Sequence, residues 1–326
     1  MLWMAQLGGW IELSDNSVNS CLTHVRVVAS RFSNAMGKSS VLTAYALLLP
    51  ALFALAIFRL YPIAATVWGS LYTESFEKAG ATVFAGFSNY LDLFTDPVFW
   101  RSLWVTIKLN LVINPVQIAL ALGLALMANQ RFPGISFYRL LFFVPIGVSV
   151  PIASILWRTM FDPNAGLINS LLSIFRIPSQ PFLISQEQAL WCIVAIATWK
   201  GISFWMIFLW AGLQDIPPQV LEAAEIDGAN RFQRFLFVTL PLLRRPLLFV
   251  LVTDTATNFL LFVPMFLLTG GGPAGSTNVL MFEAYKSGFV YGEMGRALAI
   301  VAVLLLLIVA VVSLQFRFLR PAEGER

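Results

Sequence analysis

The sequence predicts an all-α polytopic membrane protein with about six transmembrane helices. Of its 326 residues, 58% are hydrophobic and 12% are charged, and the mean hydropathy is +0.78. Ordinary soluble domains carry roughly 25% charged residues. Long apolar segments lie near residues 41–71, 99–127, 137–159, 188–213, 241–269 and 291–316. Each reaches the roughly 20 residues that a helix needs to cross a bilayer. Several are longer and contain proline or charge, so we expect tilted or bent helices partly buried among their neighbours.

The basic residues predict which loops stay in the cytoplasm. If the N-terminus is inside, the inside segments carry Arg26, Arg31, Lys38, Arg131, Arg139, Arg231, Arg234, Arg244, Arg245, Arg317, Arg320 and Arg326. The outside loops then carry Lys78, Arg176 and Lys286. Because basic residues in short loops resist translocation, this asymmetry predicts an N-in, C-in topology. The same distribution accounts for the net charge of +4 without a nucleic-acid partner.

Cysteine and histidine usage excludes several kinds of site. Cys21 and Cys192 stand far apart, and Cys192 lies inside an apolar run, so neither a disulfide framework nor a metal site is indicated. The single histidine, His24, has no neighbours of ligand type. Catalysis by histidine is therefore not expected.

The chain is expected to have three parts. Residues 1–40 form an N-terminal cytoplasmic tail. Two explanations stay open for it: the tail is disordered, or the start codon is assigned too early and translation begins at Met36. They lack the basic and apolar regions of a signal peptide. Residues 41–318 form the transmembrane domain, and residues 319–326 form a C-terminal cytoplasmic tail. Outside the membrane, Thr73–Phe99 and Asp162–Gln186 are predicted to form short interfacial helices and turns that can meet an external partner.

One compact polar element, Glu222–Phe235, interrupts this apolar chain in the loop between the fourth and fifth spans. Pro217 or Pro218 suits the first turn of a helix, where the missing N–H costs nothing. Gly228 predicts a bend, and a second helix is expected from Asn230 to Val238, with Asp227 as its cap. The pattern alone fits an amphipathic connector on the membrane surface equally well.

The sequence of this element carries a resemblance to a known family. EAAEIDGANRFQRFLFVTLP, Glu222–Pro241, resembles the EAA loop of permease subunits of binding-protein-dependent ABC importers. Three further segments, Tyr138–Asn169, Ala197–Pro217 and Phe266–Leu280, are similar to the carbohydrate-uptake group, which includes maltose and glycerol-3-phosphate permeases. The resemblance covers about residues 40 to 318.

This resemblance implies a fold, a set of partners and a location. The fold would be that of type I ABC importer permeases, in the bacterial cytoplasmic (inner) membrane. Loop 217–240 would contain the coupling helix that docks into a groove of the ATPase subunit. Its contact residues would be Glu222, Ala223, Ala224, Asp227, Gly228, Ala229, Phe232 and Phe235. The implied partners are an ATPase dimer, a second permease, usually different, and an extracytoplasmic solute-binding protein. The sequence has no Walker motif, so the chain is expected to be non-catalytic and to bind no cofactor, with ATP-Mg held by the separate ATPase.

Polar residues in the fourth and fifth spans predict where a solute passes. Charged residues in a span usually face a protein interior or an aqueous cavity. The path is assigned to Lys200, Gly201, Phe204, Trp205, Asp254, Thr257 and Asn258. Hydroxyl-matching groups beside aromatic rings suit a sugar, and Lys200 permits an anionic one. Two alternatives stay open: Lys200 and Asp254 neutralise each other or a partner subunit, or Lys200 extends its ammonium to the membrane surface.

Other features receive structural interpretations. Thr269–Pro273 lacks the lysine of a phosphate loop and is expected to be a turn at a helix end. Lys108, Asn110 and Asn114 are expected to mark a packing interface or bend, and Glu293 with Arg296 an interfacial ion pair. A self-contained secondary transporter or channel would predict internal repeats and an ion site, and a membrane enzyme would predict clustered catalytic groups. The sequence shows neither pattern clearly.

Overall fold

The computed structural model describes residues 39–75, 81–130 and 132–319. The chain divides into two compact units, residues 1–65 and 66–326. The described part of the first unit is helical: α2 (Ser39–Leu55) continues through a π-helical turn, Ala56–Leu60, into α3 (Tyr61–Gly69), which ends in the second unit. Most of the predicted N-terminal tail, with Cys21 and His24, lies outside the described residues, as does the tail after Leu319.

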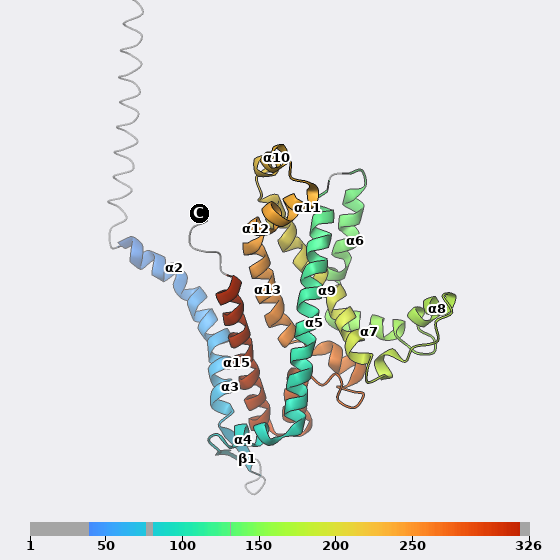
Figure 1. Cartoon of the computed structure of the whole chain (residues 1–326). Coiled ribbons are helices and arrows are strands. Elements are labelled where there is room, and N and C mark those ends of the chain that lie inside the picture. Colours follow the sequence, from blue (N-terminus) through green and yellow to red (C-terminus); the bar gives the residue numbers. More distant parts are fainter. Residues whose placement is uncertain (1–38, 76–80, 131, 320–326) are drawn as a thin grey trace, which may run out of the picture. The chain divides into compact units, whose positions relative to one another are not determined.

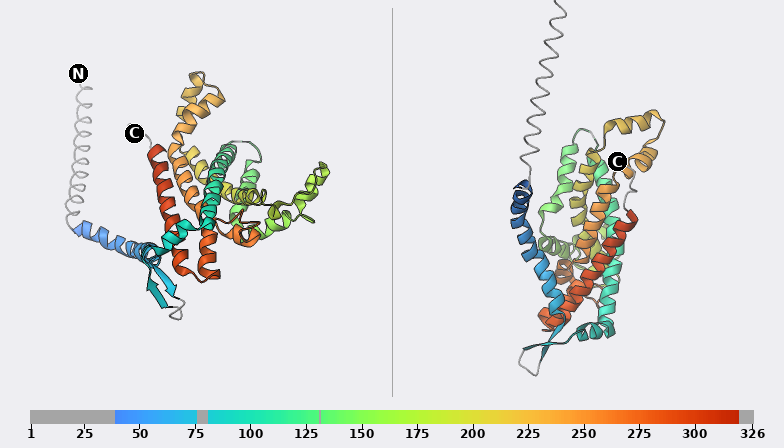
Figure 2. Two further views of the ribbon diagram at one scale, coloured as in Figure 1. Left: turned by 60° about the horizontal axis from the view of Figure 1, so that its bottom comes forward. Right: turned by 90° about the vertical axis from the view of Figure 1, so that its left-hand side faces the viewer.

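Four long helices form the body of the second unit. They are α5 (Pro97–Ala128), α9 (Ala189–Gln214), α13 (Arg244–Phe259) and α15 (Met294–Leu319), and they lie side by side in Figures 1 and 2. Ala121, Ala125 and Ala128 of α5 are fully buried beside Met206 and Leu209 of α9. Small side chains at such a seam let two helix backbones approach closely, which is how membrane helices gain packing contacts.

Two spans are bent, and one of them contains α13. α6 (Ile135–Gly147) and α7 (Val150–Met160) meet at 103°. The segment α11 (Arg231–Arg234), a π-helical turn (Phe235–Thr239) and α12 (Leu240–Leu242) meets α13 at 67°. In the described part of the chain, four helices are long and apolar enough to cross a membrane, or up to six if each bent pair is one span. The prediction of about six spans, some of them bent, agrees with this result.

The end of the second unit that carries α4 (Ser88–Thr95) contains the shorter elements. Strands β1 (Tyr72–Ser75) and β2 (Ala81–Phe84) form an antiparallel hairpin with Tyr72 opposite Phe84. The sequence analysis expected short helices and turns here, and α4 agrees with that expectation, while the hairpin corrects it. The β-branched residues Thr82 and Val83 and the contact between the Tyr72 and Phe84 rings, 5.4 Å between centroids, favour the strands.

The second predicted external segment does contain short helices. α8 (Leu167–Ile174) and a 3-10 turn (Phe182–Ile184) connect α7 to α9. Asp162 accepts hydrogen bonds from the backbone amides of Ala165 and Asn164, which hold the pKa of this carboxyl below its ordinary value. Between α13 and α15 lie a π-helical turn (Met265–Thr269), α14 (Leu280–Tyr285) and another π-helical turn (Lys286–Val290). Gly270, at φ +58°, ends the first of these turns, as predicted for the glycine-rich segment.

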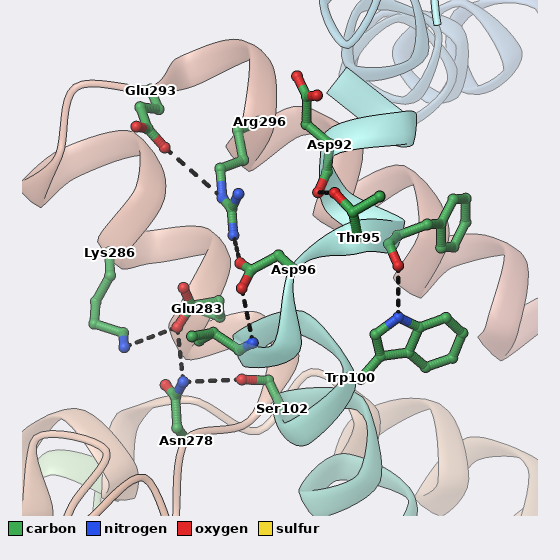
Figure 3. A network of polar contacts seen from close by, with 12 residues as sticks. Asp92, Thr95, Asp96, Trp100, Ser102, Asn278, Glu283, Lys286, Glu293 and Arg296 are labelled. Atoms are coloured by element: carbon green, nitrogen blue, oxygen red, sulfur yellow. Dashed lines mark hydrogen bonds and ion pairs between the residues drawn. The ribbon is translucent and has the colours of Figure 1, made fainter. Parts of the chain in front are cut away.

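A polar network ties three helices together at this end of the unit (Figure 3). Arg296 of α15 pairs with Asp96, which caps α5, and lies 3.7 Å from Glu293, so the predicted ion pair is confirmed. The buried Glu283 of α14 pairs with Lys286 at 2.8 Å. Asn278 donates to Glu283 and to Ser102 of α5. The network therefore fixes the starts of α5, α14 and α15 relative to one another.

Candidate functional site

The polar element at the opposite end of the unit is a helix that ends in a glycine turn. α10 (Pro218–Ile226) starts with Pro218 at its first position. Gly228 has φ +81°, and its amide donates to the carbonyl of Glu225. The amide of Ala229 donates to the carbonyl of Ala224 at 3.0 Å. These two bonds form a Schellman motif, in which a left-handed residue closes the helix. The predicted glycine bend is confirmed.

The second helix starts later than the sequence analysis expected. Asn230, not Asp227, is its N-cap: the side chain of Asn230 accepts from the amide of Gln233, and the Gln233 side chain accepts from the amide of Asn230, both at 2.9 Å. This is a capping box. Asp227 instead ends α10, because the Schellman turn places Gly228 and Ala229 between the helices.

Most of residues 217–240, the loop predicted to couple to an ATPase and called the coupling element below, is accessible at the end of the bundle (Figure 1). Of the predicted contact residues, Glu222, Ala223, Asp227, Gly228 and Phe232 are exposed, and Ala224, Ala229 and Phe235 are partly buried. Ile226 of α10 is 86% exposed, and Phe232 of α11 is 70% exposed. Arg234 of α11 bonds to Glu225 of α10 at 3.0 Å and fixes the angle between the two helices. The element thus exposes apolar side chains that are surrounded by polar ones. Surfaces of this kind are typical of protein–protein contacts.

The charged residue of the fifth span lies inside a buried polar cluster. Trp205 Nε1 donates to Asp254 Oδ1 at 2.6 Å, and Asn258 Nδ2 donates to the same oxygen at 3.0 Å. The amide of Asn258 also lies 2.8 Å from Asn114 Oδ1 and 3.1 Å from Gln117 Oε1, both on α5. Asp254 Oδ2 is buried without a hydrogen-bond partner in the described part of the chain. The cluster joins α5, α9 and α13 at one point, and Asn114 does mark a packing interface as expected.

Gly201 belongs to this cluster because it leaves room for Gln117. A Cβ at residue 201 would lie 1.4 Å from Gln117 Nε2. With glycine there, Gln117 Nε2 reaches the carbonyl of Ala197 at 3.1 Å. Only glycine lets α5 place an amide directly against the backbone of α9.

A second group of predicted residues lies on an accessible surface. Phe204 is 44% exposed, and Thr257 is exposed on α13, with its hydroxyl bonded back to the carbonyl of Thr253 at 2.8 Å. Phe204 packs on Phe208 with centroids 5.2 Å apart, and Phe208 packs on Phe249 of α13 at 5.4 Å. We call Phe204, Phe208, Phe249, Thr253 and Thr257 the aromatic–hydroxyl surface. It offers aromatic rings beside threonine side chains on two spans.

Lys200 has a partner that the sequence analysis did not consider. Its ammonium donates to the carbonyls of Pro145 at 2.7 Å and Ile146 at 3.0 Å, in the last turn of α6. A lysine near a helix C-terminus stabilises the unpaired carbonyls there. Ser149 caps the following helix, α7, by accepting from the amide of Ile152. Lys200 therefore supports the break of the third span, while Asp254 accepts hydrogen bonds from Trp205 and Asn258.

The predicted path residues thus fall into three places. Trp205, Asp254 and Asn258 meet in the buried cluster with Gly201 behind them, Phe204 and Thr257 lie on the accessible surface, and Lys200 binds α6. Sequence reasoning missed Gln117, Phe208, Phe249 and Thr253. Spacing provides a signal for some of them, because Phe204 and Phe208, like Phe249, Thr253 and Thr257, follow one another at four-residue intervals on one helix face. In the described residues, no group of three or more His, Cys, Asp or Glu could hold a metal ion.

The fold and these two sites define a helical membrane protein of the transporter class. Residues 118–322 match the family described as "Binding-protein-dependent transport system inner membrane component", and the chain belongs to this family. It is 34% identical over 275 residues to the sn-glycerol-3-phosphate transport system permease protein UgpA of Agrobacterium fabrum. This alignment covers 84% of this chain and 93% of that protein. It is 32% identical over 282 residues to the sulfoquinovosyl glycerol transport system permease protein SmoG of the same organism, with 86% and 92% covered.

Solved structures show the same fold. A chain of a bacterial ABC transporter for import of the acidic polysaccharide alginate matches with a TM-score of 0.72 and 23% identity, over 91% of this chain and 100% of that chain. A second structure, in complex with an alginate pentasaccharide-bound periplasmic protein, matches with a TM-score of 0.73 and 22% identity, over 89% of this chain and 97% of that chain. The predicted family and the type I ABC importer permease fold are confirmed.

Proposed function

We propose that this chain forms part of the translocation path of an ATP-driven importer for a sugar or sugar-like solute. The chain itself carries out no chemistry. It works with a second permease, a separate ATPase dimer that holds ATP-Mg, and an external solute-binding protein, and the path opens to one side of the membrane at a time. The observation that carries this proposal is the aromatic–hydroxyl surface on α9 and α13.

The chemistry of that surface suits a polyhydroxylated solute. The ring faces of Phe204, Phe208 and Phe249 match the apolar faces of sugar rings. The hydroxyls of Thr253 and Thr257 donate to backbone carbonyls of α13, so their oxygens would accept hydrogen bonds from solute hydroxyls. Because the surface is exposed in this single chain, a facing wall from a second permease would complete the path. Trp205, Asp254, Gly201 and Asn258 would then act behind it, by holding the two helices in register.

The names of the two relatives support a class of solute for the proposed importer. Their names assign them to sn-glycerol-3-phosphate and sulfoquinovosyl glycerol, which are both hydroxylated and anionic. For this chain we propose a solute of the same chemical class. Lys200, whose ammonium donates to the carbonyls of Pro145 and Ile146, would contribute a positive potential near the break of the third span.

The coupling element would connect the ATPase to this path. α10 and α11 present Glu222, Gly228 and Phe232 at the end of the bundle, and α11 leads directly into the bent fifth span. A displacement of the element would therefore be transmitted to α13, which carries Thr253 and Thr257. On the proposed N-in, C-in topology, this end lies in the cytoplasm, where an ATPase finds ATP.

Uptake measurements with the assembled importer test the proposal. Phe204→Ala and Thr257→Val should raise the KM for uptake or change the preferred solute, while ATPase recovery with the tagged chain and thermal stability stay at the level of the unchanged chain. Leu260→Ala is a matched control, because Leu260 is 52% exposed and lies outside this surface. Unchanged uptake kinetics and solute preference in both test variants would contradict the assignment of Phe204 and Thr257 to the translocation path. Failure to recover any ATPase with the unchanged chain would contradict the proposal that this chain assembles with a separate ATPase.

A further inference from the structure

A hollow between α5 and the start of α13 shares no residue with the aromatic–hydroxyl surface. It has a volume of about 610 Å³ and is lined by Pro115, Ile118 and Ala119 of α5 and by Leu247, Leu251 and Arg244 of α13, among others. Its lining is almost wholly apolar apart from the Arg244 side chain. The volume falls in the range of roughly 300–1,000 Å³ that is typical of ligand sites.

The sequence explains why the helices leave this space. Asn114 joins α5 to α13 through Thr255 and Asn258, so the two helices are fixed together at that level. One residue later Pro115 begins the hollow, and Ala119 contributes a single methyl group to its wall. On the other side, Leu240 and Pro241 line the hollow just before the 67° bend at the start of α13. The buried cluster therefore lies at one end of the hollow, and the bend lies at the other.

An apolar hollow of this size is unfavourable when it is empty, because its walls lose dispersion contacts. In a bilayer the surrounding apolar molecules are lipid chains, which are flexible enough to fill an irregular groove. A hydrocarbon chain needs no hydrogen bond from the groove, and the leucine side chains on α13 offer none.

The charge at the rim selects the headgroup. Arg244 lines the hollow at the start of α13, and Arg245 follows it in sequence. A guanidinium carries five N–H donors and matches phosphate oxygens in pairs. Basic pockets beside transmembrane helices are the places where anionic lipid headgroups bind. An acyl chain along Leu247 and Leu251 would bring the phosphate of its lipid to the Arg244 end.

We propose that this groove is a binding site for one acyl chain of an anionic glycerophospholipid whose phosphate contacts Arg244. The lipid acts as a wedge between α5 and α13, next to the cluster that fixes these helices. It stabilises the bend of the fifth span without contacting the solute. On the proposed topology the lipid comes from the cytoplasmic leaflet, but its chemistry does not depend on that assignment.

Native mass spectrometry of the assembled importer, purified through a tag on this chain and then delipidated, tests the site. Phosphatidylglycerol and phosphatidylcholine are added back at equal concentrations, and the retained lipid is counted. Leu247→Trp should fill the groove and abolish the retention of one phosphatidylglycerol. Arg244→Gln should weaken that retention about tenfold or more, because hydrogen bonds to charged groups contribute about 1.5–3 kcal/mol.

Two matched variants separate the site from general effects. Leu242→Trp adds the same ring to a residue that is 48% exposed and outside the groove, and Arg245→Gln removes a charge beside it. Both should retain the lipid as the unchanged chain does. If Leu247→Trp does not fold, Ala119→Phe fills the groove from the α5 side, and thermal unfolding shows whether each variant is intact.

Equal retention of both lipids by all folded variants would overturn the proposal. Loss of the second permease from Leu247→Trp, with phosphatidylglycerol still bound, would also overturn it and would mean that a protein segment covers the groove. Neither measurement involves the solute. The groove assignment can therefore fail while uptake still depends on Phe204 and Thr257, and the reverse also holds.

Discussion

Gly201 is the residue at which the packing of α5 on α9 is tightest. A methyl group there would displace Gln117, which bonds to the carbonyl of Ala197 and accepts from Asn258. Leaving a buried polar group without its partner costs about 1–3 kcal/mol. We therefore expect Gly201→Ala to lower the Tm in detergent by several degrees, since 1 kcal/mol corresponds to about 2–4 °C in a chain of roughly this size. Intrinsic tryptophan fluorescence during heating measures this change.

Gly123 provides the control for this substitution. It lies in the middle of α5, and a Cβ there would meet no atom within 4 Å. Alanine is favoured over glycine in a helix by up to about 1 kcal/mol, so Gly123→Ala should keep or raise the Tm. Equal Tm values for Gly201→Ala and Gly123→Ala would show that the Gln117 contact does not support the bundle.

Single residues also show how far sequence reasoning reaches. A charge inside a span is visible in the sequence, so Asp254 and Lys200 could be selected. Their partners could not, because Trp205 reaches Asp254, and the carbonyl of Pro145 reaches Lys200, only after the helices have packed. The i, i+4 spacing did bring Asp254 and Asn258 together, with the Asn258 amide 3.0 Å from Asp254 Oδ1. The i, i+3 spacing also predicts Thr257 on the same face as Asp254, and this is wrong, because Thr257 is exposed while Asp254 and Asn258 are buried.

Among the elements, the turn between α10 and α11 depends most clearly on one backbone conformation. Gly228 has φ +81°, and a Cβ there would meet no atom within 4 Å. Any effect of a substitution is therefore conformational and not steric. The left-handed conformation costs most residues roughly 1–2 kcal/mol, and asparagine tolerates it better.

We expect Gly228→Val to insert normally in the membrane but to reduce uptake and solute-stimulated ATP hydrolysis, because the Schellman turn sets the direction of α11. Gly228→Asn should retain most of both activities. The two rates are measured with the importer in liposomes, and the amount of inserted protein is measured by immunoblot. Uptake by Gly228→Val at the level of the unchanged chain would contradict the coupling role of this turn.

The elements were predicted unevenly. Long apolar runs identified the spans, because length and hydropathy alone define them. The turn chemistry of Pro218 and Gly228 also predicted α10 and its end. The capping box at Asn230 was missed because Asp227 and Asn230 are both good cap residues, and only the length of the glycine turn decides between them. The hairpin of β1 and β2 was missed because each strand has only four residues.

At the level of the whole molecule, the family and fold follow from the long EAA stretch, while the orientation in the membrane rests on charge. Basic residues in short loops resist translocation. The end with α10 and α11 carries Arg231 and Arg234, so we expect it in the cytoplasm, and we expect the end with β1 and α4 outside. The spans alone fit either orientation.

Cysteine labelling of intact cells tests this orientation. In a chain with Cys21→Ser and Cys192→Ser, Glu74→Cys and Glu187→Cys should react with a membrane-impermeant maleimide from outside, because both side chains are exposed. Gln219→Cys, exposed on α10, should react only after the membrane is permeabilised. The chain without cysteine controls for background. Reaction of Gln219→Cys in intact cells, with Glu187→Cys protected, would reverse the topology and would place the coupling element where no cytoplasmic ATPase can reach it.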